Sequence, residues 1–479
     1  MRIRYAAACL AACAALALGA ARAEWYVFEP DDPPEALLEA SMQVSGFSGE
    51  VTLSFLGDCT LGGESKAANS RGGFVQTALR EGYDYPFQNL KALLDGDDVT
   101  VVNLEGVLSD RKLDRVKKTF NFKGPADFAT ILPLGGVELA GLSNNHTMDY
   151  GAEGYADTQA ALEAAGVAYF DSDHVAVWAH DGVMIGFTGS AFSLSTGAQK
   201  NLRAQMEVLR EVGCQLIVHS MHAGTEYERK PTSQQKTVAA HAVDMGADLI
   251  VGHHPHVVQG YELMDGVPVV YSLGNAVFGG NRDPRDYDAL LLQAVFAYED
   301  GVPVSVRLVF HPISVSGETA YNNYQPVLLT GDDAQRVLDK MAVKIGGGEN
   351  HRMGLFDMIL LKDNHIDFAG GIRKAICGAR EYLKAKGKDI PIECEVRSLE
   401  DIDEVFTAGG ADRIMFDNFT PAMTREAVKK VAGRCETESS GGITLDTIRD
   451  YAECGVDFIS VGALTHQIKS LDMSLKACE

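Results

Sequence analysis

The sequence predicts an α/β protein in which a sandwich of sheets flanked by helices is followed by an incomplete β/α barrel. Three observations support this fold class. Apolar strand patterns alternate with helical patterns from residue 51 onward, two β-rich runs close the first region, and a cleaner β/α alternation begins after Gly346. At 479 residues the chain is long enough for two or three domains. We expect a signal peptide (1–23), a linker (24–48), a first domain (49–340) and a second domain (341–479).

The N-terminus has the features of an export signal. Arg2 and Arg4 precede a short apolar stretch at 5–19, and Ala21-Arg22-Ala23 forms an A-x-A cleavage pattern before Glu24. We therefore expect an exported, periplasmic or extracellular protein that meets a membrane only through this segment. A lipoprotein processing box at 10–13 is the alternative. Five of the 9 cysteines lie scattered in the second domain, as in a cytosolic enzyme, and this conflicts with export.

The charge balance restricts the partners. The formal net charge is −24, which disfavours nucleic acid and anionic membranes as partners but permits a local basic pocket for phosphate.

The first domain reads as alternating strands and helices after a linker that is acidic and contains three prolines. Helical patterns fall at 157–165 and 202–212. Apolar strand patterns fall at 51–56, 99–102, 137–142, 183–188, 215–219, 248–251 and 269–273, and the closing β-rich runs at 289–298 and 304–310.

The second domain follows a helix expected at 332–344. Its strands are expected at 358–362, 392–396, 413–416, 435–438 and 458–461, and its helices at 370–386, 398–408, 421–432 and 445–454. A closed barrel needs more than five strands, so the barrel is expected to be incomplete.

Polar motifs follow successive apolar strands of the first domain. They are Gly57-Asp58, Asn103-Leu104-Glu105-Gly106, Ser143-Asn144-Asn145-His146, His222-Ala223-Gly224-Thr225-Glu226-Tyr227, Gly252-His253-His254-Pro255-His256 and Gly274-Asn275. Each motif alone is a weak signal. Six in order favour a site for divalent metal, because oxygen and imidazole ligands from strand ends hold ions that activate water and bind phosphate.

These motifs resemble the CapA family, the poly-γ-glutamate capsule-synthesis proteins related to calcineurin-like metallophosphoesterases, over residues 49–329. The resemblance implies a metallophosphoesterase-like fold, a divalent metal (Mn, Zn or Fe) and a phosphoester or anionic-polymer substrate. It implies His146 as the acid or phosphate-stabilising residue. The metal ligands that it implies are Asp58, Glu105, Asn145, His222, His254 and His256, with His253 as an alternate to His254. The sequence departs from the wider phosphoesterase pattern at Cys59-Thr60, where a histidine is usual, and at Glu105, where an aspartate is usual.

A second set of polar residues lies at the strand ends of the barrel, the face where barrel enzymes keep their chemistry. Glycines after the last strands suit a phosphate held by backbone N–H groups, and the cationic residues suit other anionic groups. Two carboxylates suit ribose hydroxyls or Mg²⁺. The residues are His351, Arg352, Lys362, Glu395, Asp417, Ser440, Gly441, Gly442 and Gly462.

Residues 342–475 resemble quinolinate phosphoribosyltransferase, on motifs such as Leu-Lys-Asp-Asn-His-Ile and Glu-Ser-Ser-Gly-Gly-Ile. The resemblance implies that His351, Arg352 and Lys362 contact quinolinate. It implies that Glu395 and Asp417 contact the phosphoribosyl part of Mg²⁺-bound phosphoribosyl pyrophosphate. The phosphates would meet Ser440, Gly441, Gly442, Gly462 and His466. Lys362, Glu395 and Asp417 would be the catalytic residues.

The second resemblance is partial. The family's N-terminal domain, its first barrel strand and its Thr-Arg-Lys-Thr segment are absent from the matching region. The family completes each site with a neighbouring subunit, so a homodimer through the barrel is expected.

The leading interpretation is an exported CapA-like, metal-dependent phosphoesterase-fold protein linked to cell-envelope or poly-γ-glutamate synthesis, carrying a truncated phosphoribosyltransferase barrel. One alternative is a cytoplasmic quinolinate phosphoribosyltransferase of NAD biosynthesis. Another is a non-catalytic protein that binds an anionic polymer. A joining of two genes also accounts for the abrupt junction.

Overall fold

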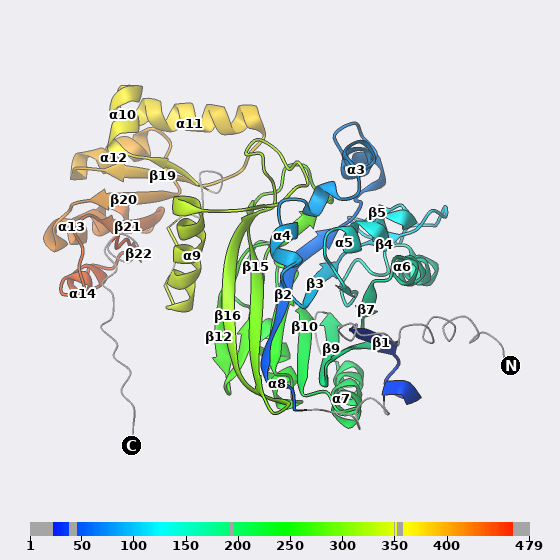
Figure 1. The fold of residues 1–479 in the computed structure, drawn as a ribbon. Helices are drawn as coiled ribbons and strands as arrows, with labels where there is room; N and C mark the ends of the chain where they lie inside the picture. The colour runs from blue at the N-terminus through cyan, green and yellow to red at the C-terminus, as the bar shows by residue number, and fades with distance from the viewer. Residues whose placement is uncertain (1–22, 38–45, 192–194, 349, 352–357, 463–479) are drawn as a thin grey trace, which may run out of the picture. The chain divides into compact units, whose positions relative to one another are not determined.

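The structure is a computed structural model, and it describes residues 23–37, 46–191, 195–348, 350–351 and 358–462 (Figure 1). The chain divides into two compact units, Met1–Met341 and Ala342–Glu479. Both units mix helices and strands, as the sequence predicted. Apart from Ala23, the expected signal peptide lies outside the described residues.

The first unit contains a seven-stranded sheet whose central strands are parallel and whose outer pairs are antiparallel. In spatial order its strands are β1 (Glu24–Phe28), β8 (Val175–His180), β9 (Val183–Ala191), β10 (Leu216–His222), β11 (Leu249–His253), β13 (Val267–Val270) and β12 (Tyr261–Met264).

An eight-stranded sheet lies in the same unit. Strands β2, β3, β6 and β7 are parallel. The long strand β15 pairs antiparallel with β2, and β16 pairs antiparallel with β15 on its other side. In spatial order the strands are β17 (Val327–Leu328), β16 (Val302–Ser314), β15 (Asp288–Glu299), β2 (Gly49–Thr60), β3 (Val99–Leu104), β6 (Leu139–Gly141) and β7 (Ala168–Phe170), with β14 (Asn275–Phe278) also paired to β2.

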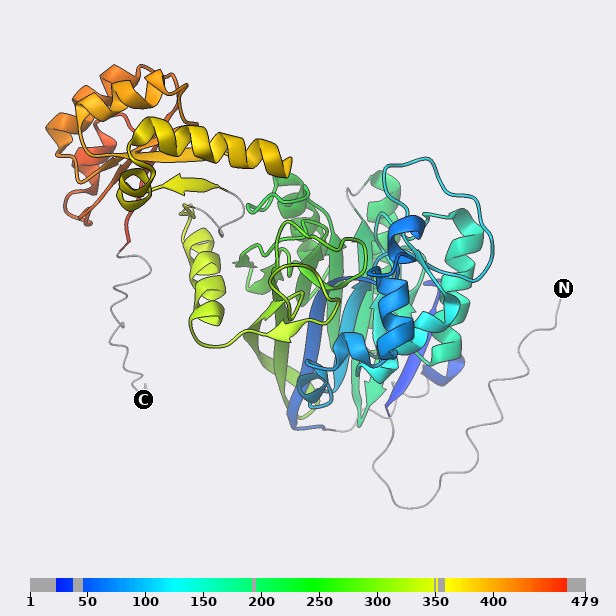
Figure 2. The ribbon, with the colours of Figure 1, turned by 90° about the horizontal axis from the view of Figure 1, so that it is seen from above.

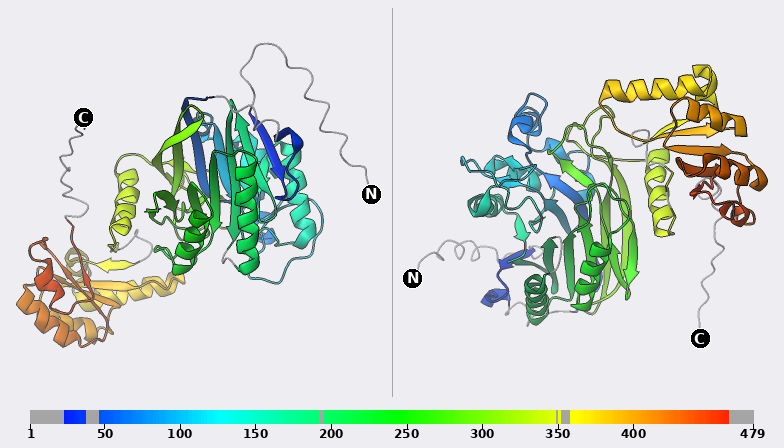
Figure 3. Two further views of the ribbon diagram at one scale, coloured as in Figure 1. Left: turned by 90° about the horizontal axis from the view of Figure 1, so that it is seen from below. Right: turned by 180° about the vertical axis from the view of Figure 1, so that it is seen from behind.

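The two sheets pack face to face. One core cluster draws buried side chains from β2, β3 and β15 on one sheet and from β9, β10 and β11 on the other. Phe170 of β7 and Phe187 of β9 stack across this layer with ring centroids 6.4 Å apart. Helices α7 (Thr196–Glu211) and α8 (Ser233–Asp244) cover the outer face of the seven-stranded sheet (Figure 3).

The outer face of the eight-stranded sheet packs against a second helical layer, which includes α3 (Phe74–Glu81) and α6 (Gly151–Ala165). Shorter elements complete this side: α2 (Ser65–Ala68), η1 (Tyr85–Phe87), α4 (Lys91–Leu94), η2 (Ala126–Thr130), α5 (Ile131–Leu134), and the strand pair β4 (Val107–Leu108) and β5 (Lys123–Gly124). Helix α9 (Gly331–Ile345) crosses the boundary between the units, and its Val337 and Met341 are buried in the first unit.

The predicted linker at 24–48 is wrong at its start. Glu24–Phe28 forms strand β1, which pairs antiparallel with β8. The ring centroids of Trp25 and Phe187 are 6.0 Å apart. This strand forms because the Trp-Tyr-Val-Phe run supplies β-favouring side chains next to an apolar core, which outweighs the acidic, proline-containing sequence that follows.

The second unit is built on a parallel five-stranded sheet: β18 (Ile359–Leu361), β19 (Ile392–Val396), β20 (Arg413–Asp417), β21 (Glu436–Ser440) and β22 (Phe458–Ile459). The strands neighbour one another in chain order, as in a barrel wall. The helices lie beside this sheet (Figure 2) and are α10 (Asp363–Ala369), α11 (Ile372–Lys386), α12 (Leu399–Thr407), α13 (Pro421–Val431) and α14 (Ile448–Ala452).

The two faces of this sheet differ in chemistry. Cys394, Ile414 and Phe416 pack with the helices, whereas the alternate positions carry charged residues such as Glu393 and Glu438. The sequence reading began the first long helix at residue 370. The structure confirms this helix as α11, which begins at Ile372. It adds α10, formed by the polar residues after Lys362, and Gly370 and Gly371, both at positive φ, separate the two helices.

Candidate metal centre

The predicted polar motifs of the first unit gather where strands of both sheets end. Asp58 lies near the end of β2, Glu105 directly follows β3, and His222 ends β10. Gly57 makes this placement possible. A Cβ at this position would lie 2.0 Å from the Gly274 carbonyl oxygen, which accepts a 3.0 Å hydrogen bond from the Asp58 backbone N–H. The Gly-Asp motif therefore reflects a close backbone approach.

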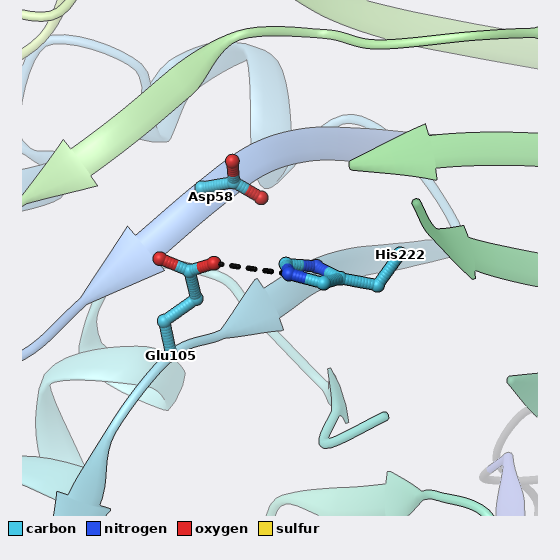
Figure 4. Close-up of side chains that lie close together, drawn as sticks. All are labelled: Asp58, Glu105 and His222. Carbon is cyan, nitrogen blue, oxygen red and sulfur yellow. Dashed lines mark ion pairs between the residues drawn. The ribbon is translucent and has the colours of Figure 1, made fainter. Parts of the chain in front are cut away.

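Asp58, Glu105 and His222 form a buried cluster. One potential ligand atom from each side chain lies within 4.8 Å of the others, and His222 Nε2 lies 3.5 Å from Glu105 Oε1. Figure 4 shows the three side chains turned toward one another. A carboxylate–carboxylate–imidazole set is suited to a divalent cation.

Asn145, His254 and His256 surround this cluster. Asn145 Oδ1 lies 2.9 Å from His222 Nε2, and His256 Nδ1 lies 3.0 Å from Asp58 Oδ2. The ring centroids of His254 and His222 are 4.8 Å apart. The structure thus brings all six predicted ligands together.

The loop after β11 holds two of these histidines in an unusual backbone conformation. His254 and His256 have φ values of 98° and 57°, a region that residues other than glycine seldom adopt. Such backbone strain concentrates at functional sites.

The pKa values of the two carboxyl groups in the cluster shift in opposite directions. Burial, and then the charge of Asp58, raise the pKa of Glu105 to about 8. Burial alone would also raise the pKa of Asp58. The hydrogen bond from His256 and the neighbouring histidines instead hold that pKa well below its usual range.

The residues present fit a cation. Both carboxylate oxygens of Glu105 are buried, and neither has a hydrogen-bond partner among the described residues. A buried carboxylate in this condition is costly without a compensating charge. A divalent ion would supply that charge.

His146 lies beside the cluster in a setting of its own. Its Nδ1 lies 2.8 Å from Asp149 Oδ2 and 3.2 Å from Lys118 Nζ. Its ring stacks on Phe122 with centroids 4.2 Å apart. These contacts hold the ring through its Nδ1 and through one ring face.

Sequence reasoning missed Asn103 as a site residue. Its side-chain amide donates to Asp58 Oδ1 at 2.8 Å and lies 3.2 Å from His222 Nδ1. Its position two residues before Glu105, at the end of the same strand, was the available signal. Asn275 was also missed as a site residue, and its Oδ1 lies 2.9 Å from His256 Nδ1.

Two further residues bear on the ligand set. The Nδ1 of His253, the alternate ligand, lies 3.7 Å from Asp58 Oδ1. Thr60 stands at the position of the usual histidine, and it is buried with no hydrogen-bond partner for its hydroxyl among the described residues. Cys59 beside it is also buried, and burial raises the pKa of its thiol, so the thiol stays neutral and is a poor ligand.

In the second unit, the predicted catalytic residues lie at neighbouring strand ends. Glu395 is buried on β19, Asp417 ends β20, and Lys362 follows β18. Burial raises the pKa of Glu395, the negative charge of Asp417 adds to the rise, and Lys362 opposes it. The three side chains therefore share one electrostatic environment.

The phosphate-loop prediction falls partly within the described residues. Ser440 ends β21, and Gly441 and Gly442 follow with φ values of 96° and 63°. Gly462 lies just after β22. Arg352 and His466 lie outside the described residues.

His351 makes contacts that the sequence did not predict. Its Nε2 lies 2.7 Å from Glu393 Oε2 and 3.4 Å from Glu438 Oε1. The Glu393 hydrogen bond raises the pKa of His351. Glu438 also pairs with Arg413 at 3.1 Å, so these groups form an ion-pair network on the charged face of the sheet.

Together these features define an α/β protein with a buried carboxylate–histidine cluster in one unit and a parallel strand–helix sheet in the other. Residues 52–280 match the family model described as bacterial capsule synthesis protein PGA_cap. Residues 334–476 match the family model for the C-terminal domain of quinolinate phosphoribosyl transferase. The chain therefore joins a PGA_cap region to a quinolinate phosphoribosyl transferase C-terminal region, the combination that the sequence motifs predicted.

Curated relatives match the second region. Nicotinate-nucleotide pyrophosphorylase [carboxylating], chloroplastic, from Arabidopsis thaliana is 49% identical over 155 residues, covering 29% of this chain and 44% of the relative. A probable nicotinate-nucleotide pyrophosphorylase [carboxylating] from Bacillus subtilis is 46% identical over 140 residues, covering 29% and 47%. A crystal structure of NadC from Streptococcus pyogenes is 42% identical, covers 31% of this chain and 50% of that chain, and has a TM-score of 0.28. The chain thus spans half or less of the length of these proteins.

Proposed function

We propose that the first unit is a metal-dependent hydrolase of phosphoester or phosphoanhydride bonds, acting in capsule or cell-envelope polymer synthesis. The main observation behind this proposal concerns the Glu105 carboxylate. It is buried beside Asp58 and His222, and neither of its oxygens has a hydrogen bond among the described residues. The PGA_cap match supports the link to capsule synthesis. The two packed sheets flanked by helices support a metallophosphoesterase-like fold.

The proposed roles follow from the contacts. A bound Mn²⁺, Zn²⁺ or Fe ion activates water and polarises a phosphoryl oxygen. The residues that would hold it are Asp58, Glu105, Asn145, His222, His254 and His256. Asn103 fixes the relative positions of Asp58 and His222 through its amide.

His146 serves as the proton donor or phosphate-stabilising group in this proposal. Asp149 engages its Nδ1, which sets the ring orientation. The Lys118 ammonium contacts both His146 and Asp149 and adds positive charge where an anionic substrate would lie.

Metal analysis of the purified full-length chain tests this function. We expect the wild type to retain transition metal and to hydrolyse a chromogenic phosphodiester. Glu105→Gln should lose most of both, because it removes the charge but keeps the shape. Glu211→Gln, the same change at an exposed position of α7, is the matched control. A well-folded wild type that binds no added Mn²⁺, Zn²⁺ or Fe²⁺ contradicts the proposal. Metal binding without hydrolysis favours the non-catalytic polymer-binding alternative.

The second unit favours a second candidate function, phosphoribosyl transfer to quinolinate, because a relative from Nicotiana tabacum that is 46% identical over 155 residues is named quinolinate phosphoribosyltransferase [decarboxylating] 2b, mitochondrial. We propose that this unit alone has little transferase activity. The match covers 44% of the Arabidopsis relative, and the Thr-Arg-Lys-Thr segment has no counterpart in it. We infer that the barrel is truncated. Even if a second molecule of this chain completed the site, the Thr-Arg-Lys-Thr segment would still be missing.

Export is part of the proposal. Strand β1 begins at Glu24, so a chain cleaved after Ala23 keeps the whole strand. In the described part of the chain, no helix combines the length and apolar character needed to cross a bilayer.

A further inference from the structure

A pocket of about 560 Å³ lies in the first unit, apart from the candidate metal cluster. The chain segment 109–125 forms one side of it, and Ser65 and Asn69, beside α2, form another. None of the six proposed metal ligands lines it. Its basic residues are Lys112, Arg115 and Lys123, and its one acidic residue is Asp110.

Two acidic groups at the pocket, Asp110 in the lining and Glu64 beside Ser65, are already engaged by the protein. Asp110 Oδ1 accepts the Ala126 backbone N–H at 3.2 Å. Glu64 accepts the Asn121 backbone N–H at 2.6 Å and lies 3.4 Å from Arg115 Nη1. These carboxylates therefore neutralise the basic residues only in part.

The basic residues retain capacity for a ligand. Lys112 is exposed and has no partner among the described residues. Lys123 donates to the Arg111 carbonyl and lies 5.6 Å above the Tyr150 ring, so a single neutral acceptor fixes its ammonium in place. Ser65 and Tyr150 add hydroxyl donors to the lining. In a chain of net charge −24, this pocket is a local positive site.

We propose that this pocket is a second binding subsite that holds an oxyanion, carboxylate or phosphate, of a polyanionic substrate whose reacting group lies at the metal cluster. This inference rests on the proposed function of the first unit. Lys112, Arg115 and Lys123 supply the charge, and Tyr150 and Ser65 supply neutral donors.

The two sites share one segment of chain. Lys118 of the 109–125 segment contacts His146 and Asp149, Phe122 stacks on His146, and the next residue, Lys123, lines the pocket. The Phe122 backbone N–H also donates to Asp149 at 2.6 Å. A ligand in the pocket therefore contacts the same segment that orients the proton donor.

Binding of poly-L-glutamate and of linear polyphosphate to the full-length chain tests this subsite. Each is titrated separately by calorimetry at low and high salt. We expect Lys112→Glu to weaken binding of at least one polymer about tenfold at low salt, and 0.5 M salt to abolish the difference. Lys200→Glu makes the same charge change at an exposed position of α7 and should leave binding unchanged. Metal content and hydrolysis of the small phosphodiester should be unchanged in both variants.

The outcomes separate the two proposals. Selective loss of polyglutamate binding identifies a carboxylate subsite, and selective loss of polyphosphate binding identifies a phosphate subsite. Equal polymer binding by wild type and Lys112→Glu overturns the subsite. So does a wild type that holds metal and cleaves the small diester but binds neither polymer. A metal-free, inactive wild type that still binds polymer through Lys112 refutes the hydrolase and leaves the pocket standing as a polyanion site.

Discussion

Asn103 illustrates how one uncharged side chain positions two of the proposed metal ligands. It donates to Asp58 and lies against His222, so it fixes two ligands without being counted among the six. We predict that Asn103→Ala weakens metal affinity roughly 10–100-fold while all six ligands remain, because residues that orient ligands commonly contribute this much. Chelator competition measures the affinity, and Asn364→Ala in the second unit is the control. An unchanged affinity would show that the ligands hold their positions without Asn103.

His219 is a buried histidine outside the metal cluster. Burial lowers its pKa to about 3, and its Nε2 lies 2.9 Å from Ser190 Oγ. The folded state keeps it neutral, whereas the unfolded state binds a proton below about pH 6.5. Its contribution to stability is therefore complete above pH 6.5 and is lost as the pH falls toward 3. Between pH 6.5 and 5 the loss is about 2 kcal/mol.

Urea unfolding followed by tryptophan fluorescence measures this effect, because both tryptophans, Trp25 and Trp178, lie in the first unit. We predict a shallower loss of stability between pH 6.5 and 5 for His219→Gln than for the wild type. Identical pH slopes for the two proteins would assign the acid sensitivity to other groups.

The positions of the candidate metal ligands could be read from the sequence in part, because they follow from local rules. Asp58 and Glu105 come at the ends of neighbouring parallel strands, whose carboxyl ends meet at one edge of a sheet. His222 ends a strand of the other sheet, so its approach to the two carboxylates depends on how the sheets pack. The contacts of Asn103 and His351 were not predictable. They depend on side-chain directions and on partners such as His222 and Glu393 that are distant in sequence.

At the scale of elements, α12 has a capping box at its N-terminus. Ser398 Oγ accepts the Asp401 backbone N–H at 3.2 Å, and Asp401 Oδ2 accepts the Ser398 backbone N–H at 2.9 Å. We predict that Ser398→Ala costs about 1 kcal/mol of local stability. Backbone amides of 399–407 should then exchange with solvent roughly fivefold faster. Ser398→Thr, which keeps the hydroxyl, should exchange like wild type. Faster exchange in both variants would point to packing rather than capping.

Element positions were largely readable from apolar periodicity, and the exceptions have physical causes. Strand β1 is short and lies next to an acidic, proline-containing sequence, so its burial against β8 was hidden. The polar residues that open α10 resemble a loop, although they form its first turn. The pairing of β15 with β2 joins segments far apart in sequence, and no local pattern encodes that pairing.

At the scale of the whole molecule, the transferase proposal makes a negative prediction. Without the Thr-Arg-Lys-Thr segment, part of the charge of a doubly anionic substrate stays unpaired, at a cost of several kcal/mol, or about a thousandfold or more in rate. A bacterium lacking quinolinate phosphoribosyltransferase should therefore fail to grow without nicotinate when it expresses residues 24–479. Robust growth that disappears with Lys362→Ala would establish a working transferase. Growth supported by the intact family enzyme is the positive control.

The cellular destination is a separate prediction. We expect mass spectrometry of the protein isolated from its native host to give a mature N-terminus at Glu24, because the A-x-A pattern ends at Ala23. An acylated Cys13 would instead establish the lipoprotein alternative. An intact Met1 in the cytosolic fraction would contradict export and would favour the transferase reading.

Strand β1 also has a consequence for the durability of the protein. It is the outermost strand beside β8, and it occupies the backbone groups that β8 would otherwise present along the sheet margin. A protease that trimmed residues 24–28 would uncover that margin, and two trimmed molecules could then join strand to strand. A stored sample that loses these residues should therefore aggregate while the residues of its candidate metal cluster remain in place.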